Sequence, residues 1–73
     1  MQLAHYHVYK DAKSEWRWRF VAKNSKIIAV SSESYHHLTD CEHSIKLVRQ
    51  GATAPVRGDE HFTQLRKQRQ LNP

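Results

Sequence analysis

The chain has 73 residues, twelve Lys and Arg against seven Asp and Glu, one cysteine and a formal net charge of +5. This length allows one small domain with a limited core, and one cysteine cannot form a disulfide within the chain. No apolar run approaches the roughly 20 residues that span a bilayer, and the N-terminus lacks the pattern of a secretory signal. We therefore expect a cytoplasmic protein without membrane contacts, stabilised by a metal or by oligomerisation.

Three segments in the first half of the chain have the pattern of β-strands. They are His5–Lys10, Glu15–Ala22 and Ile27–Ser32, in which apolar side chains alternate with polar ones or β-branched residues cluster. Short polar turns separate them, including one at Asn24–Ser25, so the sequence predicts an antiparallel meander. Alternation places three large aromatic side chains of the second strand on one face: Trp16, Trp18 and Phe20.

A helical period replaces the strand pattern after Tyr35. The apolar stripe Leu38, Cys41, Ile45 and Val48 is spaced as one face of an α-helix, which we expect to pack on the aromatic face of the sheet. His37 or Thr39 would lie at the N-cap, and Gly51 is a suitable residue to end the helix.

The C-terminal part divides at Gly58. Residues 51–58 are extended in character, and Pro55 confines a strand there to an edge or a strand start. Residues 59–73 form a basic tail that is either a short helix capped by Asp59 or disordered, because a helix of this length is marginal in water unless a partner stabilises it. The sequence thus predicts an α+β fold of the order β-β-β-α-β over residues 1–58, followed by the tail at 59–73.

This succession of residues resembles the YegP-like family, a domain of unknown function, from Tyr6 to Val56. The combination of Tyr9-Lys10-Asp11 with Arg17-Trp18-Arg19 is its most specific part. The other matching positions are His7, Val8, Trp16, Phe20, Asn24, Ile27–Ala29, Ser31, Glu33, Tyr35, Cys41, Glu42, Ile45 and Val48.

The resemblance implies the same sheet and helix, and a homodimer in which two copies share a sheet and exchange their last strands. If this strand exchange is carried over to the present chain, the exchanged strand consists of Ala54, Pro55 and Val56. The resemblance brings no established activity. The chain departs from the family pattern in both hairpin turns, where Ser14-Glu15 and Asn24-Ser25 replace glycine-containing turns, and before the helix, where His36-His37 replaces a small hydroxyl residue.

Histidine and cysteine residues offer two further hypotheses, a metal site and a thiol nucleophile. His5 and His7 point to one side of a strand, and His36, His37, His43 and Cys41 are further candidate ligands. Their spacing matches no known zinc motif, so we expect neither a metal nor a cofactor. Cys41 lies four residues after His37, but its place in the apolar stripe favours a buried packing role over catalysis.

Basic and aromatic residues provide the candidate binding surface. Arg17 and Arg19 share a strand face with Tyr9, and such a face can bind single-stranded nucleic acid, dock a protein or simply be solvated. The sequence leaves these three interpretations open. The candidate binding residues are Tyr9, Arg17, Arg19, Lys23, Lys26, Arg66, Lys67 and Arg69.

No catalytic set of residues is evident, so the sequence favours a non-enzymatic function. We expect a homodimeric adaptor or inhibitor that acts through protein–protein contacts. The alternative is a nucleic-acid-binding module that uses the basic aromatic face and the basic tail, and an enzyme that uses Cys41 is the third and weakest hypothesis.

Overall fold

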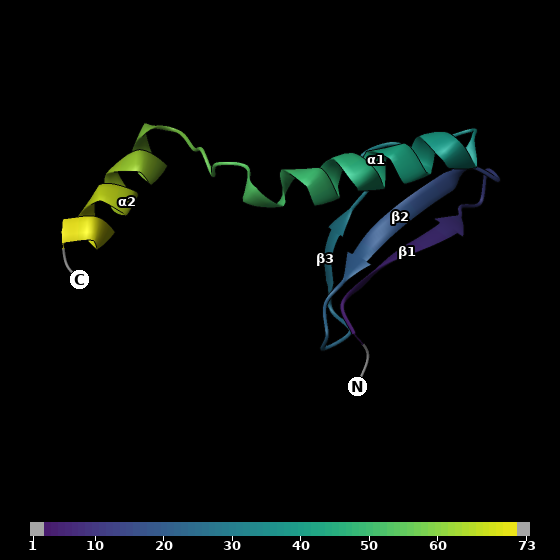
Figure 1. Ribbon diagram of the computed structural model, residues 1–73, viewed down its shortest axis with the longest axis horizontal. Helices are drawn as coiled ribbons and strands as arrows, with labels where there is room; N and C mark the ends of the chain where they lie inside the picture. The colour runs from purple at the N-terminus through teal and green to yellow at the C-terminus, as the bar shows by residue number, and fades with distance from the viewer. Residues whose placement is uncertain (1–2, 72–73) are drawn as a thin grey trace.

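The computed structural model describes residues 3–71, and side chains as far as residue 67. Helix α1 lies along one face of a three-stranded sheet, and helix α2 stands apart from both (Figure 1). The predicted α+β class is confirmed, as are three strands followed by a helix. The elements in chain order are β1 (His5–Lys10), β2 (Trp16–Val21), β3 (Ile27–Val30), α1 (Leu38–Gln50), the 3-10 turn η1 (Gly51–Thr53) and α2 (Glu60–Leu71).

The sheet is an antiparallel meander in the order β1-β2-β3. Each hairpin turn places one serine in the left-handed backbone region, Ser14 with φ 62° and Ser25 with φ 69°. The side chain of Asn24 accepts a hydrogen bond from the amide of Lys26 at 3.1 Å, which is the usual way in which Asn stabilises a turn.

The aromatic face of the sheet forms the core together with α1. Trp18 is only 6% exposed, and Tyr6 meets Trp18 and Phe20 edge-on with ring centroids 5.5 and 4.9 Å apart. Edge-to-face pairs of this kind are favourable beyond the area they bury. The indole Nε1 of Trp18 also donates a hydrogen bond to Ser44 Oγ on α1 at 2.8 Å, so both apolar burial and a directed bond hold the helix over β2.

The connection from β3 to α1 stays attached to β2. Ser31 donates its amide to the carbonyl of Trp18 at 2.9 Å, and Tyr35 and Trp16 exchange two backbone hydrogen bonds of 2.7 and 2.8 Å. The helix then starts after His37, which is the N-cap but makes no side-chain capping bond. Attachment of the chain at Tyr35 therefore sets the start of α1 without the hydroxyl cap of the family pattern.

Only the middle of the predicted helical stripe is covered. Cys41 is fully buried and Ile45 is half-buried, whereas Leu38 is 40% and Val48 47% exposed. The helix packs on the sheet mainly through β2, and both ends of its stripe stay partly exposed. Gly51 closes the helix with φ −84°, which is not the left-handed conformation expected of it, and the chain continues as η1.

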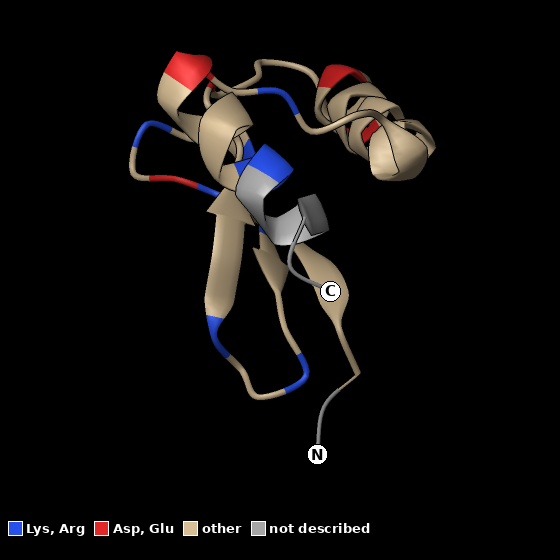
Figure 2. Ribbon diagram, turned by 90° about the vertical axis from the view of Figure 1, so that its left-hand side faces the viewer, with Lys and Arg blue, Asp and Glu red and all other residues tan. Residues whose placement is uncertain are grey.

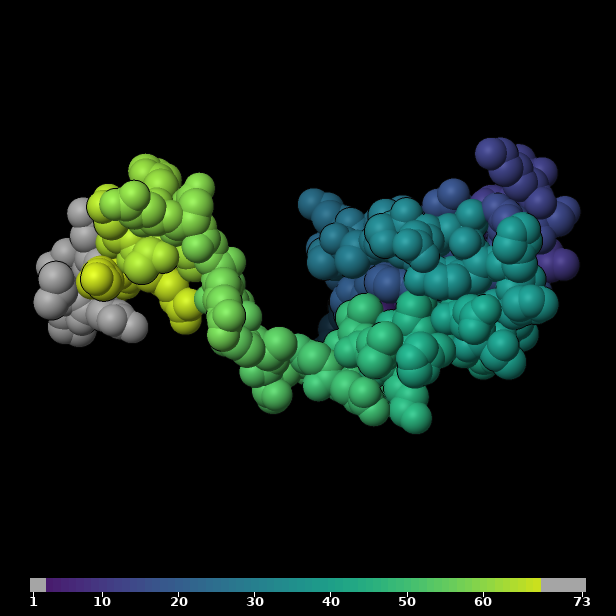
Figure 3. All heavy atoms as spheres, turned by 90° about the horizontal axis from the view of Figure 1, so that it is seen from above, coloured from purple at the N-terminus to yellow at the C-terminus, as the bar shows by residue number. Residues whose placement is uncertain are grey.

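The C-terminal arm, residues 51–71, leaves the body of the molecule. Residues 54–59 form no strand within the described chain, so a strand at Ala54–Val56 remains a prediction. Of the two alternatives for the tail, the structure has the helix, α2, and Asp59 caps it by accepting a hydrogen bond from the amide of Phe62 at 3.0 Å. Figure 3 shows this arm as a thin extension that ends well away from the sheet, which matches the longest molecular dimension of 49 Å.

Candidate binding surfaces

The face of the sheet opposite α1 carries polar and aromatic side chains; we call it the open sheet face, formed by His5, His7, Tyr9, Arg17 and Arg19. Cross-strand pairing sets His7 against Arg19 and Tyr9 against Arg17, as the alternation predicts. The rings of His7 and Tyr9 stack with centroids 5.9 Å apart, and the Arg19 guanidinium lies 4.3 Å from the centre of the Tyr9 ring. The face is therefore a preformed stack of two rings and one cation.

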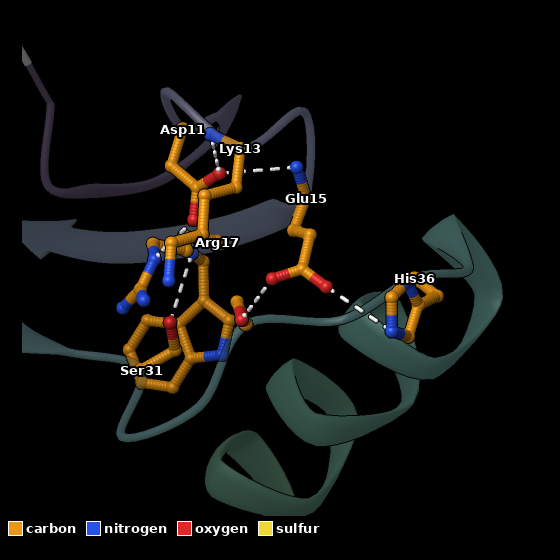
Figure 4. A network of polar contacts seen from close by, with 8 residues as sticks. Asp11, Lys13, Glu15, Arg17, Ser31 and His36 are labelled. Carbon is orange, nitrogen blue, oxygen red and sulfur yellow. Dashed lines mark hydrogen bonds and ion pairs between the residues drawn. The ribbon is translucent and has the colours of Figure 1, made fainter.

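Arg17 is held by an ion pair at the end of this face. Its Nε lies 2.7 Å from Asp11 Oδ2, and the other carboxylate oxygen accepts the amides of Lys13 and Glu15 at 2.9 and 3.0 Å (Figure 4). The bond from Arg17, followed by the amide bonds, lowers the pKa of Asp11, and the same bond raises the pKa of Arg17. Arg17 is thus neutralised by Asp11.

Arg19 is the cation that the open sheet face presents. It makes no ion pair with a described carboxylate, and its Nε is buried without a hydrogen-bond partner. Its attraction to Tyr9 is the main polar contact that holds it. The two arginines on this face therefore differ. Arg17 is paired with a carboxylate, whereas Arg19 has no described carboxylate partner.

Glu15 links the first hairpin turn to the start of α1. One carboxylate oxygen accepts a hydrogen bond from Ser34 Oγ at 2.7 Å, and the other lies 3.1 Å from His36 Nε2 (Figure 4). No sequence pattern indicates this contact, because Glu15 lies in the turn before β2 whereas Ser34 and His36 lie in the connection from β3 to α1. The β-bridge between Trp16 and Tyr35 brings these two segments side by side, and this places Glu15 next to Ser34 and His36.

The remaining basic residues do not gather on one surface. Lys23 and Lys26 lie exposed in the turn before β3, and Figure 2 shows the blue segments spread over both ends of the sheet and over the helices. On α2, Arg66 donates to the carbonyl of Val56 at 2.9 Å and lies over the ring of Phe62. Lys67 is exposed on the same helix, and the side chain of Arg69 lies outside the described residues.

An apolar edge is the surface that the sequence analysis missed. All four residues of β3 are exposed, with Ile27 at 54%, Ile28 at 64% and Val30 at 60%. The outer edge of β3 has no neighbouring strand in the described part of the chain. A β-branched run predicts a strand but does not reveal whether that strand lies inside a sheet or at its edge, so this exposure became visible only in the structure.

The thiol and the histidines form no reactive or metal-binding arrangement in the described residues. Cys41 is fully buried, and burial followed by the charge of Glu42 raises the pKa of its thiol. His37, which would have to act as the base for a Cys41 nucleophile, is exposed. Among the described residues no three His, Cys, Asp or Glu side chains lie close enough to hold a metal ion. The predicted packing role of Cys41 is confirmed.

Comparisons with known proteins give the same fold and place the chain among its relatives. The family described as "Domain of unknown function (DUF1508)" matches residues 11–57. Two UPF0339 proteins of Neisseria meningitidis are each 41% identical to this chain over 54 residues, which is 73% of this chain and 95% of theirs. They are NMB1088 of serogroup B and NMA1193/NMA1859 of serogroup A.

A solved structure agrees with this assignment. The NMR solution structure of a protein from Haloferax volcanii superposes with a TM-score of 0.70 at 32% identity, over 81% of this chain and 98% of the other. Sequence and structure therefore point to one relationship, which the residue pattern had already indicated. The chain belongs to the DUF1508, or YegP-like, family of small domains of unknown function.

Proposed function

We propose that this protein is a non-enzymatic protein-binding module, an adaptor or inhibitor, that acts as a homodimer. The observation that supports the proposal best is β3, an edge strand whose four residues are all exposed. A free apolar edge is a ready template for pairing with another chain, and soluble proteins usually blunt or cover such edges. The described residues of β3 carry no charge or proline that would do so.

The dimer is completed by strand exchange through Ala54, Pro55 and Val56. This segment supports the proposal because it is extended, with Ala54 at φ −61° and ψ 144°, and because Val56 is 64% exposed. These dihedrals are those of polyproline II, an extended conformation, and a rotation about φ would bring the residue to the dihedrals of a strand in a second copy's sheet. Pro55 is compatible with an edge position.

Sedimentation velocity at micromolar concentration tests the dimer. We expect a dimer for the natural chain and a monomer for Val56→Lys, because a charge in the exchanged strand opposes its burial. Leu65→Lys is the matched control, since it places the same charge on α2 at a similarly exposed apolar residue. A stable natural monomer, or equal effects of both substitutions, would contradict the exchange.

The arm provides the test of partner binding. Its helix α2 stands apart from the sheet, so deletion of residues 59–73 should leave the dimer folded. We expect the same deletion to abolish capture of a protein partner from a lysate of the native host, with nuclease treatment to remove capture through nucleic acid. Capture that is unaffected by the deletion counts against α2 as the docking element.

Nucleic-acid binding is the alternative, and the Arg19–Tyr9–His7 stack is the observation that favours it. Aromatic rings that stack bases and cations that meet phosphates are the usual elements of single-strand recognition. Binding to a fluorescein-labelled oligothymidylate should then fall steeply between about 50 and 200 mM salt. Failure to bind at low salt would exclude this alternative; it ranks second because Arg17 is neutralised and the other cations are dispersed.

A thiol enzyme is the third and weakest hypothesis. The burial of Cys41 and the raised pKa of its thiol both oppose a nucleophilic role. Resistance of the folded protein to iodoacetamide would exclude catalysis by this residue, whereas rapid alkylation would revive the hypothesis.

We also propose a cytoplasmic location, on the basis of a single cysteine that remains a free thiol. Among the described residues no helix has both the length and the apolar character needed to cross a membrane. Expression of a fluorescent fusion in the native host, followed by fractionation, tests this location.

A further inference from the structure

A groove of about 500 Å³ lies between α1 and β1. It arises because the helix packs over β2, which leaves the helix-facing side of β1 uncovered along one flank of α1 (Figure 1). The groove is thus on the face opposite the open sheet face and away from the β3 edge. Its lining consists of Tyr6 and Val8 from β1 and Glu42, Ile45, Lys46 and Arg49 from α1.

The floor of the groove is apolar. Tyr6, Val8 and Ile45 are each half-buried, so their remaining exposed surface faces a depression. Tyr6 is fixed from below by its edge-on contacts with Trp18 and Phe20. A rigid apolar floor of this kind is the usual feature of a site that receives a side chain of a partner.

The rim of the groove is basic. Lys46 and Arg49 are exposed on consecutive turns of α1, and neither forms an ion pair with a described carboxylate. Glu42 is the only acidic residue in the lining, so the groove has an excess of positive charge. This charge excludes the basic α2, with Arg66 and Lys67, as an occupant, because like charges would be brought together.

We infer that this groove binds a segment of a partner protein in which an apolar side chain is flanked by carboxylates. The apolar side chain would lie against Tyr6, Val8 and Ile45, and the carboxylates would pair with Lys46 and Arg49. The inference rests on the proposed protein-binding function and names the chemistry of the partner.

Fluorescence anisotropy with a defined peptide set tests the inference. The probes are fluorescein-labelled pentapeptides with one Leu, Ile or Phe between pairs of Asp or Glu, compared with peptides that carry Lys in place of the acids or Ser in place of the apolar residue. We expect binding only when both features are present. The double substitution Lys46→Gln and Arg49→Gln should weaken that binding about tenfold.

The matched control is Lys13→Gln with Arg57→Gln, which removes the same charge from two exposed residues outside the groove lining. Equal weakening by both double variants would overturn the inference, because it would show general attraction to a basic protein. So would the absence of binding by every acidic apolar peptide at millimolar concentration.

Backbone amide shifts locate the contact directly. Peptide addition should shift the amides of Tyr6, Val8, Ile45 and Lys46, and shifts confined to the open sheet face would overturn the inference. Shifts of the groove amides on simple dilution of the protein would also overturn it, because they would show that a second copy fills the groove. The dimer and the role of α2 do not depend on the groove, so failure of this inference is distinguishable from failure of the proposed function.

Discussion

The body of the molecule, residues 5–50, and the C-terminal arm, residues 51–71, are ordered by different means. In the body, hydrogen bonds join distant parts of the chain, such as Trp18 with Ser44 and Trp16 with Tyr35. In the arm, the hydrogen bonds are local: Asp59 caps its own helix, and Arg66 reaches back only to Val56. Local bonds alone seldom stabilise a 12-residue helix in water, so we expect α2 to be less stable than the body of the molecule.

The largest expected effect is on the body. Trp18→Ala removes the most buried aromatic side chain of the core and should lower the free energy of unfolding by about 3–5 kcal/mol. Urea denaturation followed by far-UV circular dichroism measures this loss, with the less buried Trp16→Ala as control. A loss no greater than that of the control would show that the core does not centre on Trp18.

A smaller effect is expected in the arm. Asp59→Ala removes the N-cap of α2 and should destabilise that helix by about 1 kcal/mol. Amide hydrogen exchange should become faster in α2 while the thermal midpoint of the body stays unchanged. A shift of that midpoint would mean that the arm packs on the body in solution, and the distinction between the two regions would fail.

The smallest expected effect depends on pH and belongs to the body. The pKa of Asp11 is lower in the folded chain than its ordinary value of 3.8, because of Arg17 and the amide of Glu15. Its contribution to stability is therefore present above about pH 4 and lost as the pH falls through the lower folded value. Asp11→Asn should reduce the fall of the thermal midpoint between pH 5 and pH 3.

Asp40→Asn serves as its control, because Asp40 lies in the first turn of α1 and makes no ion pair in the described residues. If the thermal midpoint of Asp11→Asn falls between pH 5 and pH 3 as much as that of the natural chain, the ion pair with Arg17 does not form in solution.

The local periodicities were sufficient to predict the three strands of the meander and α1, whereas the sequence left the tail as either helical or disordered. Alternation assigned Trp18 to the covered face and Arg19 to the open one, because side-chain direction in a strand depends only on position. The Asp59 cap was equally visible in the sequence. These features are local, so the residue order contains them.

The surfaces depend on contacts that the residue order does not reveal. Arg17 and Arg19 look equivalent in the sequence, and only the turn that brings Asp11 back to Arg17 separates them. Likewise, the helical stripe does not indicate that Val48 stays exposed. The groove could not be foreseen, because it follows from α1 lying over β2 rather than midway between β1 and β2.

The two turn serines have a consequence for the energetics of the chain. Ser14 and Ser25 hold left-handed backbone angles that cost an L-residue roughly 1 kcal/mol and cost glycine almost nothing. Both hairpins therefore close against a conformational penalty that the rest of the sheet must offset. Replacing either serine with glycine would relieve it without altering the open sheet face, the β3 edge or the groove. Monomer stability and surface recognition are thus separable properties of this chain.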